Sequence, residues 1–178
     1  MGSDAEKSEG DLLAERFSAA YRRLSPRVLG YLRLHGVEDP ESVTQDVFLA
    51  LFARLPTVSD DEGVRTLTFS IAHARIVDHH RSRTRRPAFV PFDPDADPRQ
   101  VASAEDAHGA AIGEQNTLAL LHRLGDDQRE ALTLRVVAEL SLDETAQVMG
   151  RSVGAVKQLQ RRALEALRAI VSSEAAHE

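Results

Sequence analysis

The chain of 178 residues contains no cysteine. This absence excludes disulfides, thiol nucleophiles and cysteine-ligated zinc, and it is compatible with a reducing compartment. Long apolar runs are also missing, since none approaches the roughly 20 residues needed to span a bilayer. The opening segment MGSDAEKSEG is polar and acidic and lacks the apolar core of a secretory signal. We therefore expect a cytoplasmic protein that is neither exported nor inserted into a membrane.

Motifs of enzymes are scarce as well. The sequence has no phosphate-binding glycine loop, no nucleophile elbow and no paired carboxylates in a recognisable context. His73, His79 and His80 raise the question of a metal site. Adjacent side chains on a helix point about 100° apart, and no carboxylate completes a ligand set, so the histidines do not favour a metal. We expect no catalytic residue, no metal and no cofactor.

The charge of the chain is unevenly distributed. The formal net charge is -6, yet residues 63–86 carry +5 and residues 87–115 carry -5. Local basic faces, rather than net charge, determine contact with phosphates. The acidic balance of the whole chain therefore does not exclude a nucleic-acid partner.

Apolar residues recur at helical spacing almost everywhere, and no segment alternates as a strand does. In the first half, start signals and prolines predict four helices: 11–24, one from Ser25-Pro26 to Gly36, one from Asp39-Pro40, and 64–86. The third carries an apolar stripe of Val43, Val47, Phe48, Leu51, Phe52 and Leu55, which leaves Thr44, Gln45 and Leu49 nearer its other side.

The prolines and aspartates that follow Pro87 predict an extended linker. Beyond it we predict helices over residues 116–124, 127–137, 142–149 and 152–171. The fold class is therefore all-α, with two small helical domains (residues 11–86 and 116–171) joined by a flexible, acidic, proline-containing linker (87–115). Residues 1–10 are expected to be disordered, and residues 172–178 form a C-terminal tail.

Residues 140–168 read LSLDETAQVMGRSVGAVKQLQRRALEALR and predict a helix-turn-helix. Ser141 followed by Glu144 matches a capping box, as does Asp127 followed by Glu130. Gly150 allows a left-handed turn, and Ser152 can cap the next helix. On that helix the basic and amide side chains lie outside the apolar stripe, where they could reach a major groove. A solvated basic face on a plain helical bundle remains the alternative.

A second basic stripe lies in the first domain. Steps of three or four residues place Arg65, Thr68, Ala72, Arg75, His79, Arg83 and Arg86 along one side of a helix. This basic block suggests contact with nucleic acid. A solvated surface is again the alternative.

The two halves together resemble extracytoplasmic-function sigma factors, the small bacterial transcription initiation factors. ESVTQDVFLALFARL is similar to the helix of that family that binds core RNA polymerase, and VRTLTFSIAHARIVDHHRSRTRR to its helix for the promoter −10 element. The stretch from Leu121 to Arg168 resembles the −35-binding domain. Ser42 and Leu67 depart from the family pattern, which often has an acidic residue and a tryptophan there.

The resemblance assigns roles to particular residues. It implies polymerase contacts by Gln45 and Asp46, and −10 contacts by Arg75, His79 and Arg83. It implies −35 contacts by Lys157, Gln158, Gln160, Arg161 and Arg162.

We therefore expect a sigma factor that binds core RNA polymerase and promoter DNA, is regulated by an anti-sigma factor, and has no catalytic activity. A stand-alone helix-turn-helix regulator, with a sensing or dimerising N-terminal domain, is the competing hypothesis.

Overall fold

The computed structural model describes residues 3–85 and 117–175. These residues form α1 (Ser3–Leu34), α2 (Pro40–Arg54), the 3-10 turn η1 (Leu55–Thr57), α3 (Asp61–Arg85), a short helical segment at residues 117–122, α5 (Asp126–Val136), α6 (Leu142–Met149) and α7 (Val153–Ala175). No strand occurs within these two ranges. The all-α prediction is thus confirmed, whereas the predicted linker, residues 87–115, lies outside the described residues.

The helix α1 is longer than the sequence predicts. We expected disorder over residues 1–10 and a helix break at Ser25-Pro26, but one helix runs from Ser3 to Leu34 with Pro26 inside it. A proline removes one hydrogen bond from a helix. Leu24 and Val28, on either side of Pro26, are both fully buried in the same core, and this shared burial favours a continuous helix over a break.

A start signal located α2, whereas α3 begins before its predicted first residue. Asp39 caps α2 by accepting a hydrogen bond from the Ser42 amide at 3.1 Å, and Pro40 occupies the first turn, as predicted. The helix α3 begins at Asp61, earlier than the predicted Val64. The Asp60 carboxylate accepts from the Gly63 amide at 2.6 Å, so an acidic run that looked like a loop forms the first helical turn.

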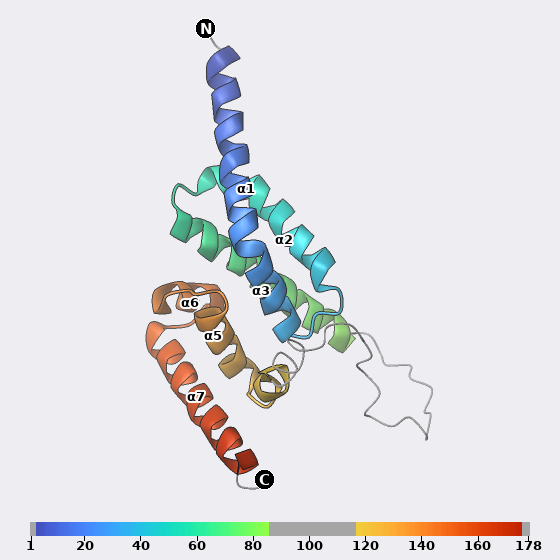
Figure 1. Cartoon of the computed structure of the whole chain (residues 1–178), viewed down its shortest axis with the longest axis vertical. Coiled ribbons are helices and arrows are strands. Elements are labelled where there is room, and N and C mark those ends of the chain that lie inside the picture. The colour runs from blue at the N-terminus through green and yellow to red at the C-terminus, as the bar shows by residue number, and fades with distance from the viewer. Residues whose placement is uncertain (1–2, 86–116, 176–178) are drawn as a thin grey trace, which may run out of the picture.

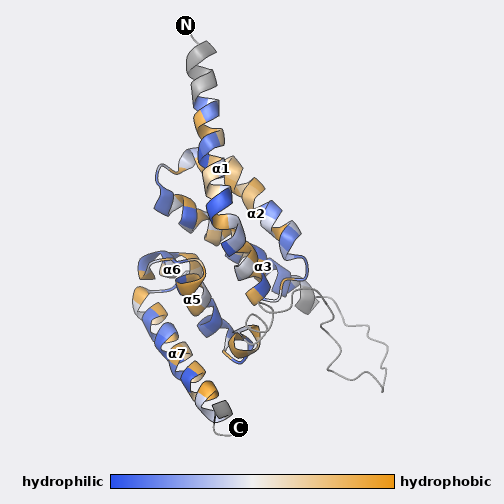
Figure 2. Cartoon of the chain, viewed as in Figure 1, coloured by the Kyte–Doolittle hydropathy of each residue, from blue (hydrophilic) through white to orange (hydrophobic). Residues whose placement is uncertain are grey.

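The two halves of the chain share one hydrophobic core. The first-half helices bury Leu24, Tyr31, Leu51 and Phe69, and the same cluster includes Leu134, Ala138, Leu140 and Val148 from the second half. Figure 1 shows α5 and α6 lying against the C-terminal part of α1 and against α3, while the N-terminal end of α1 projects beyond the other helices. A smaller cluster of Leu121, Leu124, Leu132 and Ala163 supports α7. Along α7, apolar and polar residues alternate with the turns of the helix (Figure 2).

No helix within the described part of the chain has the length and apolar character required to cross a bilayer.

Candidate nucleic-acid and polymerase interfaces

The predicted helix-turn-helix is present in α6 and α7. The hydroxyl of Ser141 accepts from the Glu144 amide at 3.2 Å, and the Glu144 carboxylate accepts from the Ser141 amide at 2.6 Å, which completes the capping box. Gly150 ends α6 with a φ of 62°, in the left-handed region that favours glycine. Ser152 then accepts from the Ala155 amide at 3.2 Å at the start of α7. Local signals therefore fix the start of α6, the turn at Gly150 and the start of α7.

The outer side of α7 carries the predicted −35-binding residues. Four of the five are exposed and Gln160 is half-buried: Lys157, Gln158, Gln160, Arg161 and Arg162. Arg161 donates to Gln158 at 2.9 Å and to Glu165 at 3.3 Å, so its guanidinium is held along its own helix. Within the described residues, Lys157 and Arg162 have no ion-pair partner. The surface therefore offers these two cations, Lys157 and Arg162, on either side of Arg161, whose guanidinium is held in place.

The predicted stripe on α3 is not one continuous basic face. Thr68 and Ala72, which we placed on it, are fully buried. The Thr68 hydroxyl donates to the Val64 carbonyl at 2.6 Å, and this bond allows a polar side chain to face the core. Spacing identified a common side of the helix, but it could not tell that this side adjoins the core.

The −10 candidates consequently differ in environment. Arg75 is exposed and lines a shallow cavity between α2 and α3 together with Arg54 and Asp78. His79 is half-buried, and its Nε2 atom has no hydrogen-bond partner. The side chain of Arg83 lies outside the described residues. Among the stripe members whose side chains the structure describes, Arg75 is the exposed one.

The polymerase candidates lie on the outside of α2. Gln45 and Asp46 are exposed, and Leu49 beside them is 69% exposed. Phe52, expected in the buried stripe, is 46% exposed and stacks edge-on against Phe17. This mixture of polar and large apolar groups is typical of a surface for a protein partner.

Thr44 differs from its predicted position. We placed it on the outer side of α2, but it is buried, and its hydroxyl donates to the Pro40 carbonyl at 2.7 Å. As at Thr68, a bond to the preceding turn removes the cost of burying the hydroxyl.

A buried polar network connects α5 to the first domain. We predicted that Glu130 would form a capping box with Asp127, but α5 starts at Asp126 after Gly125 and has no side-chain cap. The Glu130 carboxylate instead accepts from the Tyr31 hydroxyl, lies 2.8 Å from Nδ1 of His73 and 3.1 Å from Nε2 of His35. A residue read as a local cap therefore joins two domains.

The network shifts the acidity of its members. Burial would raise the pKa of Glu130, but the hydrogen bond with His73 and the other contacts outweigh burial and lower it. The hydrogen bond to Glu130 raises the pKa of His73, whereas burial lowers the pKa of His35 to about 4. Burial, together with the Glu130 charge, raises the pKa of Tyr31 well above its ordinary value. At neutral pH the centre of the network is an anion with neutral His35 beside it.

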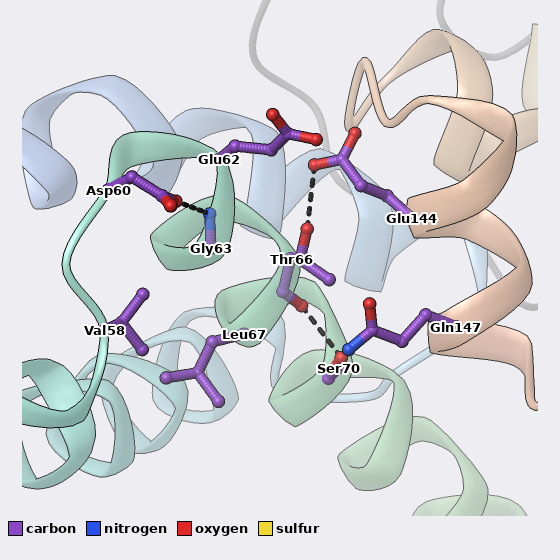
Figure 3. Close-up of a pocket in the computed structure, with 9 residues that line it drawn as sticks. All are labelled: Val58, Asp60, Glu62, Gly63, Thr66, Leu67, Ser70, Glu144 and Gln147. Carbon is purple, nitrogen blue, oxygen red and sulfur yellow. Dashed lines mark hydrogen bonds between the residues drawn. The ribbon is translucent and has the colours of Figure 1, made fainter.

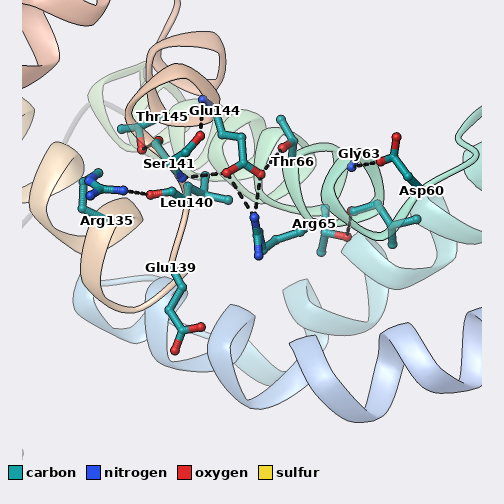
Figure 4. A network of polar contacts seen from close by, with 12 residues as sticks. Asp60, Gly63, Arg65, Thr66, Arg135, Glu139, Leu140, Ser141, Glu144 and Thr145 are labelled. Atoms are coloured by element: carbon teal, nitrogen blue, oxygen red, sulfur yellow. Dashed lines mark hydrogen bonds and ion pairs between the residues drawn. The ribbon is translucent and has the colours of Figure 1, made fainter.

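Glu144 makes a second link between the domains. Besides capping α6, its carboxylate accepts from Nη2 of Arg65 at 3.0 and 3.1 Å and from the Thr66 hydroxyl at 2.8 Å (Figure 4). Burial would raise the pKa of Glu144, but its hydrogen bonds with Ser141, Thr66 and Arg65 lower it. The carboxylate that defines the start of the helix-turn-helix therefore also holds α3.

A cavity of about 460 Å³ lies beside this contact, and Figure 3 shows side chains from both domains around it. Its walls are Val58, Asp60, Glu62, Gly63, Thr66, Leu67, Ser70, Glu144 and Gln147. Leu67, which departs from the family pattern, packs partly against the core at this cavity. Because Glu144 and Gln147 belong to α6, the cavity has its full wall only while the domains are packed together.

Sequence reasoning missed these interdomain contacts. The partners of Glu130 are 57 to 99 residues away along the chain, and no local pattern pairs them. The one available signal was Glu144, correctly read as a cap, whose remaining oxygen lone pairs could accept further donors. His73, considered earlier with His79 and His80, is hydrogen-bonded to Glu130, and no cluster suited to a metal occurs among the described residues.

Comparison with known proteins identifies both halves. Residues 20–86 match the family described as Sigma-70 region 2, and residues 120–169 match Sigma-70, region 4. The sigma factor RpoE from Bartonella quintana, solved in complex with the anti-sigma factor NepR, has a TM-score of 0.69 over 89% of this chain and 98% of that chain. The sequence identity is 21%, so this likeness shows a common fold.

Relatives in sequence identify the family more narrowly than the structural likeness does. The chain is 34% identical over 168 residues to the ECF RNA polymerase sigma factor ShbA of Streptomyces griseus subsp. griseus, an alignment that covers 90% of this chain and 85% of ShbA. It is 32% identical over 168 residues to the ECF RNA polymerase sigma factor BldN of Streptomyces coelicolor, with 91% of this chain and 62% of BldN covered. This chain therefore belongs to the extracytoplasmic-function family of RNA polymerase sigma factors.

Proposed function

We propose that this chain binds core RNA polymerase, directs it to a subset of promoters and helps to open the DNA strands, without catalysis of its own. It acts in the cytoplasm, where the polymerase acts. The observation that carries the proposal is the helix-turn-helix of α6 and α7, whose outer side presents Lys157, Arg161 and Arg162 in an otherwise acidic chain. A helix with such a face can enter a major groove and contact base edges and phosphates.

The roles proposed for the other surfaces come from the resemblance to the family, and the composition of these surfaces is compatible with them. The exposed side of α2, with Gln45, Asp46 and Leu49, is proposed to bind the polymerase. On α3, Arg75 is proposed to contact the −10 element, with His79 and Arg83 following it along the helix. An anti-sigma factor is proposed as the regulatory partner, because RpoE of Bartonella quintana was solved with one.

Run-off transcription tests the function. Purified core polymerase is mixed with the chain and a library of genomic fragments, and we expect discrete transcripts that neither component produces alone. Sequence-specific DNA binding by the chain alone, with no polymerase-dependent transcript, would instead support the stand-alone regulator.

A variant separates polymerase binding from folding. Replacing both Gln45 and Asp46 by alanine removes exposed side chains and opens no cavity, so thermal melting should be unchanged while capture of core polymerase falls. The matched control, Glu15→Ala with Ser18→Ala, changes two exposed residues of α1 and should capture polymerase like the parent. Undiminished capture by the Gln45 and Asp46 variant would remove α2 from the proposal.

A further inference from the structure

The contact between the two domains is strongly asymmetric in charge. Three glutamates of the second domain, here called the interdomain glutamates, face hydrogen-bond donors of the first: Glu130, Glu139 and Glu144. Glu139 pairs with Arg27 at 2.8 Å, Glu130 with Tyr31 and His73, and Glu144 with Arg65 and Thr66. Each carboxylate therefore comes from one side and each donor from the other. This pattern is complementary in charge, as in an interface between separate proteins.

Two of the interdomain glutamates are buried while the domains are packed together. Glu130 and Glu144 are only 7% and 5% exposed. A carboxylate buried without partners is costly, and both of these have several. When the domains part, water can hydrate the same groups, so the desolvation cost of closing offsets much of the attraction. An ionic contact of this kind is suited to opening and closing.

Arg65 and Thr66, called here the Arg65–Thr66 pair, form a small anion-binding site on α3. A planar guanidinium next to a hydroxyl suits a phosphate as well as a carboxylate. Glu144 uses only the Nη2 atom of Arg65, and the buried Nε atom of Arg65 has no hydrogen-bond partner. The Glu144 carboxylate therefore leaves the Nε–H donor of Arg65 unused. An anion with more oxygens could accept a hydrogen bond from it.

Promoter binding requires the domains to separate, a step that rests on the proposed function. Elements centred near −10 and −35 lie about 25 base pairs apart, or about 85 Å at 3.4 Å per base pair. A fully extended linker of about 29 residues reaches at most about 95 to 105 Å. One chain can therefore contact both elements only in an open form, in which Glu144 has left α3.

We propose that the Arg65–Thr66 pair is a binding site for a DNA phosphate, and that Glu144 occupies this site in the closed free chain. The free protein then withholds part of its DNA surface until the domains are separated. The second domain acts as an internal competitor, with a carboxylate in the place of a phosphate.

The test uses the full chain without polymerase. Glu144→Gln keeps an oxygen for the Ser141 amide, so the cap of α6 is retained while the charge that pairs with Arg65 is lost. Asp143→Asn is the matched control, since it removes the same charge from the adjacent exposed residue. Affinity for a fluorescein-labelled duplex of mixed sequence is measured by anisotropy at several salt concentrations. Because the chain lacks cysteine, Ser18→Cys and Ser172→Cys supply sites for a dye pair that reports domain separation by energy transfer.

We expect Glu144→Gln to lower energy transfer and to tighten DNA binding several-fold. The slope of the logarithm of the DNA-binding constant against the logarithm of salt concentration, called here the salt slope, should become steeper by about one. Adding Arg65→Gln should return affinity and slope to the parent values while energy transfer stays low, and Asp143→Asn should change little. If Glu144→Gln separates the domains but binds DNA like Asp143→Asn, the pair is not a phosphate site. If energy transfer and affinity both stay at parent values, Glu144 neither closes the chain nor masks the pair.

A second variant leaves the cap of α6 untouched. Arg27→Glu places a carboxylate against Glu139 and should open the chain, and adding Glu139→Arg should close it again. Arg27→Glu makes the chain more negative, so electrostatics alone predicts weaker DNA binding, whereas unmasking predicts stronger binding. Weaker binding by an opened Arg27→Glu chain would overturn the proposal. None of these measurements uses polymerase, so their failure is distinguishable from a failure of transcription.

Discussion

At the scale of single residues, Glu130 faces more donors of the first domain than either of the other interdomain glutamates does. Tyr31, His35 and His73 all face its carboxylate inside the protein. Removing one member of a buried, hydrogen-bonded charge group leaves the others unsatisfied and costs more than the group contributes as a whole.

Glu130→Ala should therefore lower the free energy of unfolding by about 3 kcal/mol. The control Glu139→Ala removes a glutamate that is largely exposed and paired with Arg27, so it should cost at most about 1 kcal/mol. Urea denaturation followed by circular dichroism measures both. Equal effects for the two variants would show that burial of the Glu130 network contributes nothing of its own.

The two network histidines predict opposite dependences on pH. Burial lowers the pKa of His35 to about 4, so the stability that neutral His35 contributes is present above its ordinary pKa and is lost as the pH falls from about 6.5 toward 4. The pKa of His73 is raised by Glu130, so its contribution is present below its ordinary pKa and is lost as the pH rises through the raised value. The charged or titratable groups around His35 are Tyr31 of α1, Glu130 and Arg129 of α5, and His73 and His80 of α3.

Stability measured against pH should thus have a maximum near neutrality. The His35 titration alone should cost about 2 kcal/mol between pH 7 and pH 5. His35→Gln should abolish most of this acid loss, while His73→Gln should remove the loss on the alkaline side. An acid limb that is the same in His35→Gln as in the parent would contradict the assignment.

At the scale of elements, local signals predicted local structure well. The Ser141 capping box, the Gly150 turn and the Ser152 cap are each complete within a few residues, and each is confirmed. Wherever a remote partner decided the outcome, the sequence could not show it. Pro26 sits inside α1 because both flanking turns reach one core, and Glu130 leaves its expected cap for partners on α1 and α3.

The candidate site residues also divide into those that local sequence could predict and those that depend on remote neighbours. The outer face of α7 is set by its own apolar stripe, and its exposed cations could be predicted from spacing. The stripe on α3 could not, because Thr68 and Ala72 are covered by neighbouring helices, and the sequence does not state which side of a helix its neighbours occupy.

The turn of the helix-turn-helix provides an element-scale prediction. Gly150 has a φ of 62°, and no atom lies within 4 Å of the place that a Cβ would take, so Gly150→Ala should cost about 1 kcal/mol through backbone strain alone. Gly154 lies in the first turn of α7 without a positive φ, and Gly154→Ala should be neutral or stabilising by up to about 1 kcal/mol. Thermal melting of the two variants distinguishes these outcomes. Similar melting temperatures would mean that the turn does not require glycine.

At the scale of the whole molecule, the closed form holds together the two surfaces that we propose to bind DNA. The first domain presents Arg75 on α3, and the second presents Lys157 and Arg162 on α7. Packing through a common core and the interdomain glutamates places these surfaces in one body. A promoter would have to separate these two surfaces. We propose that the first domain contacts the −10 element and the second domain contacts the −35 element.

A double-mutant cycle between protein and promoter tests that claim most directly. Transcription is measured with core polymerase for the parent, for Lys157→Ala with Arg162→Ala, and for Arg75→Ala, on a responsive promoter and on versions with the −35 or −10 element replaced. We predict that the α7 variant loses about 1 to 3 kcal/mol of promoter engagement on the intact promoter and nothing more once the −35 element is replaced. Arg75→Ala should show the same dependence on the −10 element alone. Losses that simply add, whichever element is replaced, would contradict the assignment of one domain to each element.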